Sequence, residues 1–390
     1  MKKILIVNNN LEIGGVQKAL VNLLREISND YDITLLLFSA TGAYIEEIPD
    51  NIKIIQLASW YRFLGFSQSQ CKSKKDYLTR GILAFITKTF GRTLALKIMS
   101  FTQKKLPDDY DVAISYLHNG NEKSFYGGCN EFVLNKVNAR QKIAFLHCDF
   151  AQSGANTKRN VAKYKKFDKI AACSYGCMHS FKRCVDFDSK KLFKVSNCHD
   201  FSRILHLSQE SPVEYCKNEI NVVSVARLSS EKGIDRGINA IKFAIRNGIN
   251  VKYHIVGDGA MRSHLENLAR ELGISENVKF YGNQSNPYRY MVNADLLLIP
   301  SYHEAAPIVI DEARCLNLPI LATQTTSSND MVASRNCGWV CENEQPGINE
   351  ALLSLLKDRQ KFKNLKKEMK CQIVDNGIAV SDFHNLIYAE

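Results

Sequence analysis

Short apolar runs alternate along the whole chain with segments whose apolar positions recur at helical spacing. This alternation is typical of parallel sheets built from strand–helix–strand units. We predict strands at the apolar runs in each half. They read KILIVNN, DITLLLFS, IKIIQL, DVAISYL, KIAFLHC, KIAACS and LFKVSN, and then INVVSVAR, VKYHIVG, VKFYG, ADLLLIP, LPILAT and GWVCEN.

A polar stretch, SQESPVEYCKNE (208–219), separates the two series of strands. The chain has 390 residues, which is more than one hydrophobic core normally serves, so two domains are expected. The predicted fold is α/β, with two Rossmann-like, doubly wound domains that face a central cleft. We place the first domain at residues 1–205 and the second at 206–376, followed by a closing helix at 377–390.

The amino-acid composition is that of a globular protein and does not indicate a particular activity. Apolar residues make up 45% and charged residues 23% of the chain, which is ordinary for a globular protein. The apolar run Ile4–Val7 is too short for a signal peptide, and no run reaches the ~18 apolar residues of a membrane span. Twelve cysteines in such a chain are expected to be reduced thiols, so we expect a cytoplasmic protein.

The net charge of +11 lies almost entirely in the first half. Residues 71–106 hold nine basic residues and one acidic residue, interleaved with apolar positions at helical spacing. Two interpretations stay open: an anionic membrane surface, or a solvated charged face over core-facing residues. Nucleic acid is not an expected partner, because no nucleic-acid-binding motif accompanies the charge.

Several glycines and polar residues fall just after predicted strands. In open parallel sheets, ligands bind at the carboxyl ends of the strands. Gly14 and Gly15 precede a helix after the first strand, and Gly257 and Gly259 repeat this arrangement in the second half. Glycines there let backbone N–H groups approach a phosphate at the positive end of a helix, although each pair alone is a weak signal.

Two cations and one histidine follow other strands. Arg227 lies just past INVVSVA, and Lys232 stands beside Gly233 at the start of the next helix. Two cations at a strand end suit a diphosphate, whose charge they offset. His147, after KIAFL, points toward the same predicted cleft, although a lone histidine is more often structural.

Three Asp-x-Asp sequences raise the question of a metal-bound nucleotide. Two of them precede strands, at Asp30–Asp32 and Asp109–Asp111, and the third, Asp186–Asp188, lies in a turn. None lies at the carboxyl end of a strand, where a ligand is expected. We therefore predict no catalytic metal.

Glu304 and Glu312 flank the start of one predicted helix, in SYHEAAPIVIDEARC. Pro307 favours a helix beginning at that residue, which leaves Glu304 on the loop near the open N–H groups. Helical projection puts Glu312 on the inward face and Asp311 with Arg314 on the solvated rim. A buried carboxylate needs donors, either from the protein or from a ligand hydroxyl, and we favour the ligand.

These residues fit a single ligand. Arg227, Lys232 and backbone N–H groups would hold a diphosphate, while Glu312 would accept hydrogen bonds from a ribose diol. Glu304 would hold a second polyol near the phosphate. Such a ligand is a nucleotide-sugar.

At these positions the sequence resembles the retaining glycosyltransferases of the GT-B type, of the kind that assemble bacterial polysaccharides. The resemblance rests on Gly14-Gly15, RLSSEKG (227–233), the Glu304–Glu312 pair, and nearly all of residues 220–325. It differs where the family often has Glu-Gly, because Ala305 and Ala306 follow Glu304 here. That difference bears on the identity of the donor.

The resemblance implies roles for the site residues. The expected catalytic residues are Glu304, His147, Arg227 and Lys232, and the expected donor-binding residues are Gly14, Gly15, Gly257, Gly259, Ala306, Pro307, Ile308 and Glu312. It also implies transfer without a metal or other cofactor, and a helix at 377–390 that crosses back to the first domain.

The function that we predict is transfer of a sugar, with retention, from a nucleotide-sugar to a growing glycan in surface polysaccharide synthesis. The expected donor is a UDP-sugar and the expected acceptor is a glycan or glycolipid. Two alternatives stay open: a non-hydrolysing nucleotide-sugar epimerase, and a catalytically silent nucleotide-sugar-binding partner of another transferase.

Overall fold

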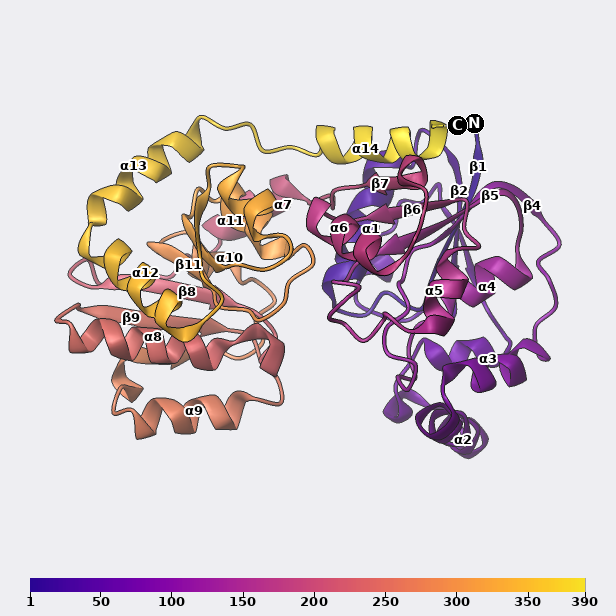
Figure 1. Cartoon of the computed structure of the whole chain (residues 1–390), viewed down its shortest axis with the longest axis horizontal. Coiled ribbons are helices and arrows are strands. Elements are labelled where there is room, and N and C mark those ends of the chain that lie inside the picture. The colour runs from indigo at the N-terminus through magenta and orange to yellow at the C-terminus, as the bar shows by residue number, and fades with distance from the viewer. Residues whose placement is uncertain (390) are drawn as a thin grey trace. The chain divides into compact units, whose positions relative to one another are not determined.

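The computed structural model describes residues 1–389, which form two compact units (Figure 1). The first unit consists of Met1–Cys198 with residues 376–389, and the second is His199–Asp375. Residue 390, the last of the predicted segment 377–390, lies outside the described residues.

The first unit is built on a seven-stranded parallel sheet with the order β3-β2-β1-β4-β5-β6-β7. Strands β1, β2, β4 and β6 are largely buried, as their continuous apolar runs predict, whereas the edge strand β3 is mostly exposed. The strands are β1 (Lys3–Asn8), β2 (Asp32–Leu37), β3 (Lys53–Gln56), β4 (Asp109–Ser115), β5 (Asn138–Leu146), β6 (Lys169–Ala172) and β7 (Leu192–Lys194).

The α-helices described in the first unit are six from residues 1–198 and one, α14, from the end of the chain. They are α1 (Gly15–Ile27), α2 (Lys74–Phe90), α3 (Arg92–Ser100), α4 (Cys129–Lys136), α5 (Lys158–Tyr164), α6 (Tyr175–Cys184) and α14 (Gly377–Tyr388). Side-chain caps explain several starts, because Ser73, Thr157 and Ser174 each accept a hydrogen bond from a backbone N–H of the first turn.

The second unit is built on a six-stranded parallel sheet with the order β10-β9-β8-β11-β12-β13. The strands are β8 (Ile220–Val225), β9 (Val251–Val256), β10 (Val278–Phe280), β11 (Leu296–Ile299), β12 (Ile320–Thr323) and β13 (Gly338–Cys341). All thirteen strands of the two sheets lie within the predicted runs or overlap them. The α/β fold with two Rossmann-like halves is therefore confirmed.

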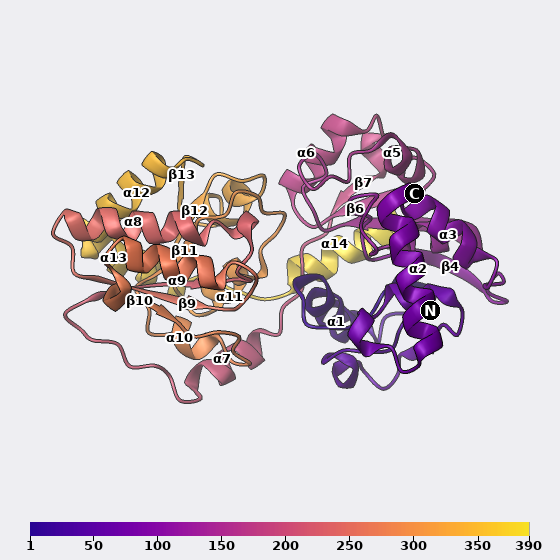
Figure 2. The same cartoon turned by 90° about the horizontal axis from the view of Figure 1, so that it is seen from below.

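Two apolar clusters cover opposite faces of the second sheet. Alternate residues such as Val222 and Val223 contribute to different clusters, as the two-residue period of a strand requires. One cluster includes α8, α9 and α12, and the other includes α7, α10 and α11; α8 and α9 are seen in front of the strands in Figure 2. The helices are α7 (Phe201–Gln209), α8 (Ile234–Arg246), α9 (Arg262–Glu271), α10 (Tyr288–Met291), α11 (Ile308–Cys315), α12 (Gln345–Lys357) and α13 (Arg359–Lys370).

The units do not follow the sequence-based domain limits at every point. The predicted limit at residue 205 falls inside α7, whose contacts with α10 and α11 place the whole helix in the second unit. The domain limits 1–205, 206–376 and 377–390 stay a prediction.

The last helix, α14, packs on the first unit rather than on the unit that precedes it. Phe383, Leu386 and Ile387 join the apolar cluster that includes α1 and the strands of the first sheet. Lys194 donates to Asp382 at 2.8 Å, and Lys2 donates to the Ile387 carbonyl at 3.1 Å. The described ends of the chain consequently lie side by side, as Figure 1 shows.

Within residues 1–389, none of the helices is both long and apolar enough to cross a membrane.

Candidate active site

The loop that follows β11 holds Glu304 in a fixed network of donors. Lys232 Nζ donates to Glu304 Oε1 at 2.8 Å, and Ser301 Oγ donates to the same oxygen at 2.7 Å. Thr326 Oγ1 donates to the Glu304 carbonyl at 2.7 Å. Lys232, Ser301, Glu304 and Pro307 line one pocket at the carboxyl ends of β8 and β11. The sequence prediction of a cation and a carboxylate at one strand edge thus corresponds to a direct ion pair.

The base of this loop is held by Arg236, a buried residue of α8 that sequence reasoning missed. Its Nε donates to the Pro300 carbonyl at 3.0 Å and its Nη1 to Asn343 Oδ1 at 2.8 Å. The guanidinium also lies 3.8 Å from the centre of the Tyr302 ring. Since Pro300 and Tyr302 flank Ser301, Arg236 fixes the start of the loop that carries Glu304. The available signal in the sequence was an arginine in the first turn of the helix that begins directly after Lys232 and Gly233.

Two glycines allow backbone segments of the second unit to approach closely. Gly233 has a φ of +60°, and a Cβ there would lie 2.2 Å from the Pro300 carbonyl oxygen. Gly257 has a φ of +134°, and a Cβ there would lie 1.9 Å from the Ala226 carbonyl oxygen. Side chains at either position would separate loops that meet at the carboxyl edge of the sheet.

Arg227 lies on one of these loops, beside Gly257 and Gly259. The Leu228 N–H donates to the Asp258 carbonyl at 2.9 Å, which joins the Arg227 loop to the glycine loop. The Arg227 side chain is 73% exposed and donates to Glu231 at 2.8 Å. An exposed ion pair of this kind is weak, so the guanidinium is available to an anion.

Helix α11 begins one residue later than predicted, with Pro307 as its N-cap and Ile308 as its first residue. Ala306 packs against the neighbouring apolar cluster. Glu312 is buried as predicted, with an exposed fraction of 4%, and its Oε1 accepts a hydrogen bond from the Tyr288 hydroxyl at 2.9 Å. The protein itself therefore supplies a donor to Glu312, where the sequence had favoured a ligand.

The prediction for Asp311 was wrong. Asp311 is buried, not on a solvated rim, and it accepts from Arg314 and from Arg335 at 2.8 Å each. His199 Nε2 lies 3.4 Å from its second oxygen. Burial raises the pKa of Asp311, but the hydrogen bond with His199 and the charges of Arg335 and Arg314 outweigh it and hold that pKa well below its ordinary value. Helical projection failed because distant segments cover this side of α11.

In the first unit, Gly14 and Gly15 lie where the sequence placed them, at the start of α1 after β1. Gly14 is the N-cap of α1, and a Cβ there would lie 2.5 Å from Gln17 Oε1. The Gln17 side chain is buried and donates to the Tyr126 hydroxyl at 3.5 Å. The glycine turn is thus in contact with the loop of residues 118–128, which follows β4.

His147 lies at the end of β5, and a second histidine faces it from the end of β4. Because Ser115 pairs with Ala144, the continuing register sets His118 beside His147, and their ring centres are 6.4 Å apart. Burial and the neighbouring ring lower the pKa of His147 to about 3, and burial with the Arg92 charge lowers the pKa of His118 to about 4. His147 Nε2 and His118 Nδ1 are buried without a hydrogen-bond partner.

The sequence analysis missed His118. The signal that could have found it is its position at the end of a strand adjacent to that of His147. Two neutral rings at one strand edge accept or donate single hydrogen bonds, as sugar hydroxyls require.

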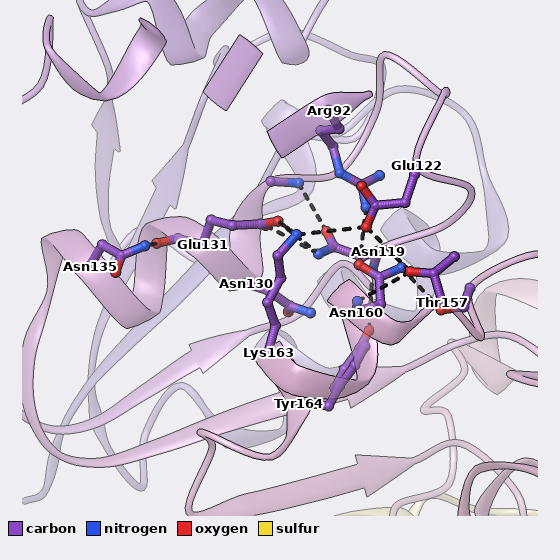
Figure 3. A network of polar contacts seen from close by, with 12 residues as sticks. Arg92, Asn119, Glu122, Asn130, Glu131, Asn135, Thr157, Asn160, Lys163 and Tyr164 are labelled. Atoms are coloured by element: carbon purple, nitrogen blue, oxygen red, sulfur yellow. Dashed lines mark hydrogen bonds and ion pairs between the residues drawn. The ribbon is translucent and has the colours of Figure 1, made fainter. Parts of the chain in front are cut away.

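A buried polar network fixes the loop 118–128 in the first unit (Figure 3). Arg92 is fully buried and donates to the carbonyls of Tyr126 and Asn121 at 3.0 and 3.3 Å. Lys163 lies 2.5 Å from Glu131, which in turn accepts from Asn119 Nδ2 at 3.1 Å. Burial raises the pKa of Glu131, but the charges of Lys163 and Arg92 lower it below its ordinary value, so the network holds an ionised carboxylate.

The predicted residues therefore form two groups, one in each unit. Lys232, Glu304, Pro307 and the residues around them are brought together in the second unit, while Gly14, Gly15 and His147 share the carboxyl edge of the first sheet. Among residues 1–389, no group of three or more His, Cys, Asp or Glu is arranged to hold a metal ion.

Comparison with known proteins gives a match in the second half of the chain. The family model described as Glycosyl transferases group 1 matches residues 210–372. The chain is 37% identical over 130 residues to the lipopolysaccharide glucosyltransferase WaaG of Escherichia coli (strain K12), which is 32% of this chain and 34% of that protein. The chain covers 44% and 34% of the length of the first two curated relatives that it matches.

A longer match is more distant. The chain is 22% identical over 376 residues, 94% of each protein, to the N-acetylgalactosamine-N,N'-diacetylbacillosaminyl-diphospho-undecaprenol 4-alpha-N-acetylgalactosaminyltransferase of Campylobacter jejuni. Among solved structures, Anabaena Alr3699/HepE in complex with UDP and glucose is similar over the whole of both chains, with a TM-score of 0.68 and 17% identity.

Proposed function

We propose, from the premise that residues 210–372 form a glycosyl transferases group 1 domain on a GT-B fold, that this protein is a retaining glycosyltransferase. It transfers a sugar from a nucleotide-sugar, a UDP-sugar in this proposal, to a growing, lipid-linked glycan in surface polysaccharide synthesis. The observation that carries the proposal is the Lys232–Glu304 pair in the pocket at the ends of β8 and β11.

The pair supports donor binding because Lys232 can bind the diphosphate of the donor and Glu304 can bind its sugar. Lys232 and the exposed Arg227 would offset the charge of the leaving diphosphate, which the open start of α11 at Ala306, Pro307 and Ile308 would also face. Glu304, with its position fixed by Ser301, would accept hydrogen bonds from hydroxyls of the transferred sugar. Entry of a diphosphate would draw Lys232 toward the new anion and leave Glu304 Oε1 with one acceptor position for the sugar beside the hydrogen bond from Ser301.

The remaining donor contacts follow from placement in the second unit. Glu312 would accept hydrogen bonds from the ribose diol while the Tyr288 hydroxyl continues to donate to it. Gly257 and Gly259 keep the loop beside Arg227 close to the sheet, where their own N–H groups donate to the Gly282 carbonyl and to Asp258 Oδ1. They would bind the donor through the shape of this loop.

In the proposed reaction, the bond between the anomeric carbon and the diphosphate oxygen breaks. The acceptor oxygen bonds to that carbon on the same face of the sugar, and its proton passes to the leaving phosphate. Cations and N–H groups take up the developing negative charge, so the proposal needs no metal or other cofactor.

The first unit would bind the acceptor at the carboxyl edge of its sheet. Among its residues, His147 is proposed as catalytic, and Gly14 and Gly15 are proposed as donor-binding. A lipid-linked acceptor is supported by the Campylobacter relative, whose name specifies a diphospho-undecaprenol acceptor. A UDP donor is supported by the UDP in the similar Anabaena structure. This function places the protein on the cytoplasmic side of a membrane.

The test is a screen of UDP- and GDP-sugars for thermal stabilisation of the protein, followed by product analysis of the best donor with a lipid-linked glycan. Glu304→Gln is expected to keep nucleotide-dependent stabilisation and to lower kcat about a hundredfold or more, because a positioned charge at the reacting sugar is lost. Glu342→Gln, an exposed residue of the same unit, is the matched control. Full transfer activity of Glu304→Gln with a proven donor would refute the proposal.

A further inference from the structure

Helix α2 of the first unit exposes a row of large apolar side chains. Leu78, Ile82 and Phe85 are spaced to share one face of the helix, and their exposed fractions are 65%, 52% and 65%. We call these three residues the α2 face. Exposure of three neighbouring apolar side chains on one helix is unusual for a surface without a partner.

The opposite side of α2 is packed, so the outward direction of the α2 face is fixed. Leu83 and Thr87 are buried on that side. Arg62 donates to Asp76 at 2.6 Å, and Arg80 donates to the Phe66 carbonyl at 2.8 Å and to Gln68 at 2.8 Å. These contacts attach the helix to the segment 62–68 and prevent it from rolling its apolar residues inward.

The segment 71–106, which contains the α2 face, is rich in exposed lysines. The only acidic residue in 71–106 is Asp76, which is paired with Arg62. Phe90, Leu94 and Phe101 of the same segment are exposed as well. The exposed lysines of this segment are Lys72, Lys74, Lys75, Lys88, Lys97, Lys104 and Lys105.

Helix α13 of the second unit shows that a basic helix need not have such a face. It exposes Lys361, Lys363 and Lys367, but its large apolar side chains Phe362 and Met369 are buried. Helix α13 therefore has the charge pattern of a solvated helix, whereas α2 combines cations with exposed apolar side chains.

We infer that the α2 face docks on an anionic lipid bilayer. Leu78, Ile82 and Phe85 enter the boundary between headgroups and acyl chains, and the surrounding lysines contact acidic headgroups. A second copy of the chain is a poor occupant, because it would bring two sets of lysines together. Nucleic acid would leave the apolar row in water. Of the two interpretations of residues 71–106 from the sequence, the exposure of these side chains favours the membrane.

The docking helix is connected to the candidate site of the same unit. Helix α2 ends at Phe90 and is capped by Gly91, and the next residue, Arg92, donates to carbonyls of the loop 118–128. The Arg92 N–H also donates to the Glu122 carbonyl at 2.7 Å. The chain therefore leads from α2 through Gly91 to the residue that shapes the loop 118–128, as suits an acceptor delivered from a membrane.

The experiment is co-sedimentation of the full chain with vesicles, which needs no donor or acceptor and so stands apart from any test of transfer. Vesicles with one third phosphatidylglycerol are compared with vesicles of pure phosphatidylcholine, at low and high salt. We expect binding to the anionic vesicles that weakens with salt. The triple variant Leu78→Ser, Ile82→Ser, Phe85→Ser should lower the partition coefficient on the order of tenfold or more.

Two further variants separate this inference from misfolding and from bulk charge. Lys74→Glu with Lys75→Glu should also lower binding on the order of tenfold, with an unchanged melting temperature. Lys363→Glu with Lys367→Glu, and Ile373→Ser, are matched controls outside the α2 face and should bind as the unaltered chain does. The inference is overturned if the unaltered chain ignores anionic vesicles at low salt, if the triple variant binds equally, or if the α2 face instead mediates dimers in sedimentation.

Discussion

The carboxyl edges of the two sheets differ in the charge of their side chains. In the second unit the edge is charged and already paired, with Lys232 on Glu304 and with Arg314 and Arg335 on Asp311. In the first unit His118 and His147 follow β4 and β5, and burial lowers the pKa values of both rings so far that they are neutral at pH 7.

This difference matches two kinds of ligand. An edge with paired ions can exchange an internal partner for a charged one, as a diphosphate would require. An edge with neutral rings excludes charge and favours hydroxyl groups. The two edges thus differ in the ligands that they favour, and each can be tested separately.

The largest effect is expected where the charged edge is also structural. Asp311→Ala leaves Arg314, Arg335 and His199 around a buried space without their carboxylate. The free energy of unfolding should fall by about 3–5 kcal/mol, as when one member of a buried ion pair is removed. Urea unfolding followed by circular dichroism measures it, with exposed Glu350→Ala as the control. A loss below about 1 kcal/mol would mean that α11 does not depend on this cluster.

The next effect tests whether the charge on the pocket is functional. Lys232→Gln removes the cation from Glu304 and from the proposed diphosphate, so kcat/KM for the nucleotide-sugar should fall about a hundredfold. Steady-state kinetics with the donor found in the screen measure this change. The exposed Lys217→Gln in the same unit should be neutral. Equal kinetics for both variants would remove the electrostatic basis of the comparison.

The smallest effect concerns the neutral edge and its pH dependence. The pKa of His147 is lowered in the folded state, so between pH of about 3 and 6.5 the folded chain binds fewer protons than the unfolded chain. Its contribution to stability is complete above this window and is lost as the pH falls through it. His147→Gln should therefore reduce the loss of unfolding free energy between pH 7 and pH 5 by about 1–2 kcal/mol.

The control for this pH series is His264→Gln, whose ring is exposed on α9. Unfolding curves at each pH for the three proteins give the slopes directly. A His147→Gln slope identical to that of the unaltered chain would show that the ring is accessible to protons in the folded state, contrary to its burial.

The strands were predictable because parallel strands are buried on both faces and read as continuous apolar runs. Runs such as KILIVNN and ADLLLIP mark β1 and β11 without any knowledge of their neighbours. The helix start at Pro307 was nearly correct for a similar reason, since proline constrains its own backbone and that of the preceding residue.

The environment of the site residues was less predictable, because it depends on segments far away in the sequence. Asp311 is buried by Arg335 and His199, which come from other parts of the second unit. Glu312 receives its donor from Tyr288 on another helix. His118 gains importance only from the register that sets β4 beside β5. One-helix projections contain none of this information.

The return of α14 to the first unit has a consequence for synthesis of the chain. The second unit is continuous in sequence, so all of its residues emerge from the ribosome before α14 does. Until then the apolar seat for Phe383, Leu386 and Ile387 beside α1 stays open on the first unit. The unit that is translated first is thus the last to be completed. A nascent chain stalled before residue 377 would expose this apolar surface to chaperones.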